Sequence, residues 1–446
     1  QKQLDAEQAY GGMRRPSKVN DMGEVSMRLR RITETYLKKN PAVQRLLIQA
    51  SLLIQAIGGP KGAFDYEAKW IAELRALWAT ELQALDSGPV EGQLVSTPIR
   101  YHLVKAWLTA AADPAAQIID WLVTGAPAGI TQPIPDIGVF PSKPDSRNLT
   151  PNELDEVAEH LDNYSSLEEH ERADELMDEI MDPARGWVEV FDDIDAVRNY
   201  LQGHDPVISP LGVVSKDIKD AEGNVTSTKD RLILDPKRSR SNEAALAPFR
   251  IVLPRPTDAV HDALRIQRHA LRQGLTTIGG IIWLVLDVAD AYWLIPLHPE
   301  ERRFQCAMWK GKWIVFKRTG QGTKASSLTW SHISAALSRL LQSLFTSSEA
   351  ALETYSDDPL LVIAGSTATH DRLAAIFISA LIVTGFRLSF HKGQYSRQVT
   401  WIGTQLMPSA EGVILTVSES ILADLRLLIN DTLLKNVVSI KIIRRL

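Results

Sequence analysis

Three aspartates stand out because their positions suit phosphate-transfer chemistry. Asp287 directly follows the apolar run 282–286, and Asp357 and Asp358 stand side by side 70 residues later, between two further apolar runs. A strand end and a tight turn can together place three carboxylates around one point. Carboxylate oxygens suit Mg²⁺, and two such ions stabilise the attacking and leaving oxygens of an in-line phosphoryl displacement. We therefore predict a two-metal site that takes two Mg²⁺ ions, with Mn²⁺ as a substitute.

Composition excludes several other classes of protein. The chain has 446 residues, 45% of them hydrophobic, which predicts a large core and two or more domains. A single cysteine, Cys306, excludes an internal disulfide framework and a zinc site built on cysteine pairs. No apolar run approaches the roughly 18 residues of a membrane span, so we expect no membrane contact. The expected location is intracellular: the cytoplasm, a virus-like particle or the nucleus.

Charge is divided unevenly along the chain. Residues 1–200 contain 20 Lys and Arg against 32 Asp and Glu, a balance of −12. Residues 201–446 contain 29 against 22, a balance of +7. A basic second half suits a surface that follows a phosphate backbone.

The elements that must position the aspartates are short strands and amphipathic helices. Residue patterns predict strands at 282–286, 313–316, 352–355, 360–363 and 399–406, and helices at 330–344 and 370–384. Residues 207–216 and 231–235 are β-rich and flank a predicted hairpin turn at 220–224. This order predicts a mixed sheet backed by helices, with the paired aspartates on a hairpin at its open face.

Six segments, in order, resemble the reverse transcriptase domain of retroviruses and LTR-type retroelements. Residues 285–292 resemble the first palm motif of that family, and Tyr355-Ser356-Asp357-Asp358 matches its YxDD box. The remaining segments are Gln321-Gly322 (the QG element), Gly385-Phe386 with Lys392 (after the palm helix), Trp401-Ile402-Gly403 (the primer grip), and Lys216 with Arg231 (the fingertip hairpin). The resemblance covers roughly residues 204–440.

The resemblance implies an α+β fold, the right-hand polymerase. It would have fingers, a palm of mixed sheet backed by helices, and a partial thumb. Residue patterns, and not the resemblance, predict a mostly helical N-terminal region before it. The expected divisions are 1–149 (helical region of unknown role), 150–203 (acidic helical linker), 204–284 (fingers), 285–408 (palm) and 409–446 (the start of a truncated thumb).

The resemblance also implies roles for individual residues. Asp287, Asp357 and Asp358, with the carbonyl of Val288, would hold the metal ions. Tyr292 would pack under the incoming sugar and leave no room for a 2′-hydroxyl. The other nucleotide contacts would be Lys216, Arg231, Gln321, Gly322 and Lys392, and the primer would lie against Trp401, Ile402 and Gly403.

The activity implied is RNA-directed DNA polymerisation, a nucleotidyl transfer. Its partners would be an RNA template, a DNA primer–template duplex, dNTPs and other parts of a Pol polyprotein. Two alternatives stay open. An RNA-directed RNA polymerase usually carries an aspartate where Tyr292 stands, so Tyr292 argues against it. A catalytically inactive or domesticated reverse-transcriptase fold, acting as a nucleic-acid-binding scaffold, typically loses one of the three aspartates, and all three are present.

Overall fold

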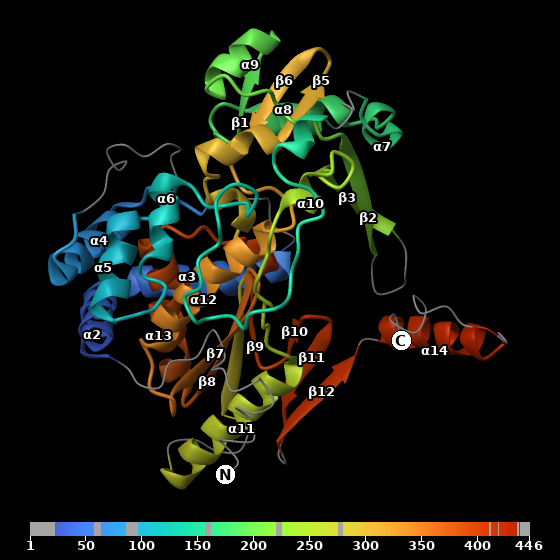
Figure 1. Cartoon of the computed structure of the whole chain (residues 1–446). Coiled ribbons are helices and arrows are strands. Elements are labelled where there is room, and N and C mark those ends of the chain that lie inside the picture. Colours follow the sequence, from blue (N-terminus) through green and yellow to red (C-terminus); the bar gives the residue numbers. More distant parts are fainter. Residues whose placement is uncertain are drawn as a thin grey trace.

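A four-stranded antiparallel sheet lies at the centre of the structure, a computed structural model. It describes residues 23–57, 64–85, 97–156, 162–219, 225–274, 280–409, 412–417, 419–434 and 437. The strand order is β7-β8-β4-β9 (Figure 1). The strands are β7 (Ala350–Tyr355), β8 (Asp358–Ala364), β4 (Ile281–Val285) and β9 (Gln394–Ser396). Leu361 and Ile363 face one apolar cluster and Leu360 and Val362 face another, so the sheet is buried on both faces.

Helices cover the two faces of this sheet. One face packs against α12 (Ser326–Gln342) and α13 (Thr367–Val383), and the other against α11 (Pro256–Arg272). The expected α+β class is confirmed. One detail differs from the expected mixed sheet: each strand pair in it is antiparallel, because β7 and β8 form a hairpin and β4 runs opposite to β8 and β9.

The N-terminal helices form an outer layer over α13. They are α2 (Glu24–Lys39), α3 (Pro41–Ile57), α4 (Lys69–Leu82) and α5 (Tyr101–Ala110). Arg75 Nε donates to the carbonyl of Val383 at 3.0 Å, and Arg30 forms two hydrogen bonds with Glu349, at 2.6 and 2.7 Å. The N-terminal region lies close to the end of α13: a Cβ on Gly385, which follows that helix, would lie 2.0 Å from the carbonyl oxygen of Pro98. The helical region thus shares the core of the central sheet.

A second, smaller sheet combines distant segments. Its strands are β1 (Val188–Phe191), β6 (Lys312–Phe316) and β5 (Cys306–Trp309), in the order β1-β6-β5. The helix α8 (Ala173–Met181) packs beside it in a separate apolar core. The segment expected as an acidic helical linker, 150–203, therefore has helices and also a strand. Its domain boundaries remain predictions.

Two hairpins complete the described part. The first is β2 (Leu211–Lys219) with β3 (Val225–Leu234), whose predicted turn at 220–224 lies outside the described residues. The second begins with β10 (Val399–Trp401) and β11 (Thr404–Pro408), followed by β12 (Val413–Val417) and α14 (Glu419–Leu433). The prediction of one strand over 399–406 was wrong. Ile402 (φ 43°) and Gly403 (φ 80°) are both left-handed, as a two-residue hairpin turn requires.

Among the residues that the structure describes, no helix has the length and apolarity needed to cross a bilayer.

Candidate active site

The paired aspartates lie on the tight turn between β7 and β8. Tyr355 pairs with Asp358, which leaves Ser356 and Asp357 as the turn residues. Ser356 has φ 57°, and its carbonyl accepts a hydrogen bond of 2.7 Å from Ser334 Oγ on α12. The turn geometry and this bond to a buried helix together fix the hairpin tip.

Backbone hydrogen bonds bring Asp287 beside that tip. The amide of Leu286 donates to the carbonyl of Pro359 at 3.0 Å, and the amide of Val288 donates to the carbonyl of Asp357 at 2.9 Å. Asp287 follows the end of β4, so the structure places all three aspartates at one end of the central sheet. Val288, whose carbonyl was predicted to bind metal, is the next residue along the chain and lies at the same end of the sheet.

The electrostatics of this end favour bound cations. Burial raises the pKa of Asp358 to about 6, and the negative charges of Asp357 and Asp287 add to the effect. Burial also raises the pKa of Asp357, with Asp287 contributing. Lys392 Nζ lies 2.6 Å from each carboxylate oxygen of Asp287. Carboxylates that repel one another in a partly buried site are stabilised by positive charge, so their chemistry fits a divalent metal.

The side chains do not, as they stand, form a preassembled metal site. Within the described ranges, no three His, Cys, Asp or Glu side chains are close enough together to hold an ion. Both oxygens of Asp287 are engaged by Lys392. Metal binding would therefore need Lys392 to move off Asp287 and the carboxylates to turn toward one another.

The fingertip hairpin presents a basic face. Lys216 lies opposite Lys229, and Val214 lies opposite Arg231. Directly opposed residues of antiparallel strands project to the same side, so Lys216, Lys229 and Arg231 share one face. The other face carries Val213 and Leu232 into the apolar core around α8.

Lys229 is the residue that sequence reasoning missed. Burial lowers its pKa, and the charges of Lys392 and Arg231 lower it further, while Asp287 and Asp290 oppose the shift. These interactions place its ammonium group near the aspartates. The sequence could have indicated Lys229, because it lies two residues before Arg231 and residues two apart share one face of a strand.

The Gln321-Gly322 element lies against the base of this hairpin. Gly322 has φ 105°, and a Cβ there would lie 2.3 Å from the carbonyl oxygen of Leu234 at the end of β3. Its own carbonyl accepts a hydrogen bond of 2.9 Å from Asn242 Nδ2. Only glycine permits this approach, and the Gln321 side chain is left exposed.

Tyr292 is the last residue of the first palm motif and lies on the short helix η3 (Ala291–Leu294). Its ring is half-buried, and its hydroxyl lies 3.4 Å from Ser327 Oγ at the start of α12. The next residue, Trp293, stacks on Trp187 with 4.6 Å between ring centroids. The segment before β1 thus supports the backbone that carries Tyr292.

The predicted primer-grip residues are joined to the catalytic hairpin. Trp401 is buried, and its Nε1 donates to the carbonyl of Asp358 at 3.1 Å. Ile402 and Gly403 form the turn that follows. A change at Trp401 would therefore reach the aspartates directly.

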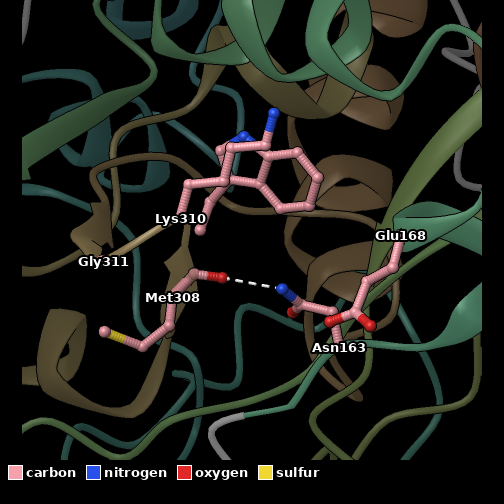
Figure 2. A pocket seen from close by; sticks show the side chains of 6 residues that line it. Asn163, Glu168, Met308, Lys310 and Gly311 are labelled. Atoms are coloured by element: carbon pink, nitrogen blue, oxygen red, sulfur yellow. Dashed lines mark hydrogen bonds between the residues drawn. The ribbon is translucent and has the colours of Figure 1, made fainter.

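A separate surface pocket of about 310 Å³ lies at the turn between β5 and β6, on the smaller sheet. Figure 2 shows Asn163 Nδ2 donating to the carbonyl of Met308, at 2.9 Å, on its wall. Lys310 also lines it and forms an ion pair of 2.6 Å with Asp174. None of the predicted site residues lines this pocket.

Comparison with known proteins gives a family match over the segment that contains the three aspartates. Residues 233–406 match the family model described as reverse transcriptase (RNA-dependent DNA polymerase). Similar solved structures are foamy viral protease-reverse transcriptases. One, in complex with dsDNA, is 13% identical with a TM-score of 0.42, covering 66% of this chain and 48% of that one. Another, in complex with an RNA/DNA hybrid, is 12% identical with a TM-score of 0.38, covering 63% and 31%.

The chain spans less than half of the length of each of these two structures. The family match itself includes Asp287, Tyr292, Gln321, Asp357, Asp358 and Trp401. Residues 233–406 of this chain are therefore a domain of the reverse transcriptase family, whose members are RNA-directed DNA polymerases.

Proposed function

We propose that this chain extends a primer on an RNA or DNA template with dNTPs, by nucleotidyl transfer at Asp287, Asp357 and Asp358. One observation carries the proposal: backbone pairing of Val288 with Asp357 brings these three acids to one end of a buried sheet. Two carboxyl groups there have raised pKa values caused by burial and by each other's charge. Such clustering is typical of a functional site.

The three carboxylates would hold two Mg²⁺ ions, with Mn²⁺ as a substitute. When bound, these ions supply the charge that activates a primer hydroxyl and stabilises a leaving pyrophosphate. Lys392, which engages Asp287, would turn to the triphosphate. Lys216, Lys229 and Arg231 would meet the triphosphate from the fingertip, with arginine suited to paired phosphate oxygens and lysine acting as a point charge.

Tyr292 would set the sugar preference, because a ring packed under the incoming sugar excludes a 2′-hydroxyl. Gln321 and Gly322 would lie beside the nascent base pair. Trp401, Ile402 and Gly403 would hold the primer end, since the indole of Trp401 donates a hydrogen bond to the backbone carbonyl of Asp358. The nucleic-acid partners would be a template and a primer–template duplex, within a longer Pol polyprotein.

Primer extension on a primed RNA template tests the proposal. We expect extension with dNTPs but not NTPs, and its loss in Asp357→Asn. Asp195→Asn is the matched control, because that carboxylate is 83% exposed on α9 (Ile194–Tyr200). Extension by Asp357→Asn at the wild-type rate would refute the assignment. Nucleic-acid binding without extension by the wild type would favour the inactive scaffold.

A further inference from the structure

A basic groove lies at the end of the central sheet opposite to the catalytic aspartates. This α11 groove has a volume of about 460 Å³ and is lined by five basic side chains, one leucine and two serines: His261, Leu264, Arg265, Arg268, His269, Arg272, Ser347 and Ser348. No acidic side chain of the described residues lines it. A concave surface lined in this way attracts anions.

The basic residues form one stripe along the helix. His261, Arg265, Arg268 and Arg272 follow one another at intervals of four, three and four residues, so they lie on one face of α11. The opposite face, with Ala259, Ala263 and Ile266, packs in the core against the sheet. The stripe is therefore held rigidly, with Arg268 and Arg272 exposed.

Arg265 is the anchored member of this stripe. Its Nη1 donates to the carbonyl of Ser347, which fixes the turn before β7 as the second wall of the groove. Its Nη2 lies 3.4 Å from a carboxylate oxygen of the buried Asp262. This local pairing neutralises part of the charge at Arg265, so Arg268 and Arg272 carry the attraction for an anion.

The position of the groove separates it from the aspartates. Asp358 begins β8, whereas Ala364 ends it and donates to the carbonyl of Glu349, next to Ser348. Seven residues of strand span about 20 Å at about 3.3 Å per residue. A ligand in the groove therefore lies about 20 Å from the reaction site.

The dimensions fit a run of phosphates. Arg265 and Arg272 are seven residues apart, or about 10.5 Å along a helix at 1.5 Å per residue. One strand of a duplex places a phosphate about every 3.4 Å along its axis, so the stripe matches about three successive phosphates. A single inorganic phosphate would engage only part of it.

We propose that the α11 groove binds the sugar–phosphate backbone of nucleic acid, as a contact surface additional to the polymerase site. The interaction is with phosphates and not with bases, so it is independent of sequence and weakens with salt. This proposal does not depend on primer extension by the same chain.

Fluorescence anisotropy with labelled duplexes tests it on the full 446-residue chain. The two duplexes have about 6 and about 24 base pairs, because about 6 base pairs span only about 20 Å. The variant is Arg268→Gln with Arg272→Gln. The control is Arg31→Gln with Arg45→Gln, two exposed arginines on α2 and α3.

We expect the groove variant to bind the long duplex about tenfold more weakly and to lose less affinity for the short one. The slope of log affinity against log salt should become shallower by about 2, since each lost phosphate contact removes about 0.9. The control should match the wild type.

Several results would overturn the inference. An unchanged salt slope in the groove variant would do so, as would an equal loss of affinity in the control. A lower melting temperature with unchanged binding would mean that the arginines only complement the dipole at the end of α11. Displacement of the duplex by inorganic phosphate at equal charge concentration would point to a free phosphate ligand instead. By contrast, groove-dependent binding that is retained in Asp357→Asn, together with loss of extension, would support the groove independently of the proposed function.

Discussion

His332 gives a prediction whose magnitude follows from its surroundings. It lies on α12 and is 1% exposed, and neither ring nitrogen has a hydrogen-bond partner within the part of the chain that the structure describes. Aromatic rings surround it, with Phe140 at 5.0 Å and Trp121 at 5.9 Å between centroids. The same helix contacts the hairpin of Asp357 and Asp358, because Ser334 Oγ donates to the carbonyl of Ser356.

Burial lowers the pKa of His332 from 6.5 to about 4, and the charge of Arg339 contributes. The folded protein therefore keeps this ring neutral at a pH where the unfolded chain binds a proton. Stability from this group is fully present above about pH 6.5 and is lost as the pH falls toward 4. The whole shift corresponds to about 3.4 kcal/mol, and about 2 kcal/mol of it is lost between pH 7.5 and pH 5.

The perturbation is His332→Leu, which removes the titrating ring and its two unpaired nitrogens. The free energy of unfolding is measured by urea titration at pH 7.5 and at pH 5. Between these two pH values, we expect the wild type to lose about 2 kcal/mol more than the variant loses. At neutral pH the variant should be as stable as the wild type or more so, since an unsatisfied buried polar group costs about 1–3 kcal/mol. His204→Asn, an exposed histidine, is the control and should keep the wild-type pH dependence. Equal pH dependence in His332→Leu and the wild type would refute this reasoning.

Three further predictions concern the site and its support. Tyr292→Val should admit ribonucleotides, and an unaltered ratio of dNTP to NTP extension rates would exclude a sugar-gate role. Lys229→Gln should raise KM for dNTP more than it lowers primer–template affinity, because its ammonium lies near Asp287; a selective loss of duplex binding would move Lys229 to the duplex path. Arg339→Met should destabilise the fold by about 3–5 kcal/mol, because it leaves the buried carboxylate of Asp113 without the ion pair that Arg339 Nε forms with it at 2.6 Å. Adding Asp113→Asn should recover part of that loss in urea unfolding, and no recovery would mean that the pair is not the cause.

Local patterns were enough to locate the elements that carry the three aspartates. The apolar runs before Asp287 and on either side of Asp357 predicted strands, and β4, β7 and β8 lie there. The predicted helices at 330–344 and 370–384 correspond to α12 and α13, with starts shifted by three or four residues. The helices are predictable because their period is set by which side chains face the core, and the strands because burial on both faces makes them short apolar runs.

Shorter-range features were harder to predict where the backbone conformation decides them. The strand predicted over 399–406 is rich in β-forming residues and is interrupted at Gly403, yet Ile402 also adopts a left-handed conformation, which its side chain disfavours. The surrounding β10–β11 pairing imposes this turn. The two-residue spacing from Arg231 could have identified Lys229, but only the fold showed that its charge interacts with those of Asp287 and Asp290.

What the sequence determined by itself was the place of the three aspartates at strand ends. The tertiary structure decided how distant segments meet: β1 pairs with β6, whose residues lie more than 100 positions later, and the N-terminal helices cover α13. It also decided that Lys392 engages Asp287 and that five basic side chains share the α11 groove. Such contacts depend on which apolar surfaces exclude water together, and this is a property of the whole chain that no local period encodes.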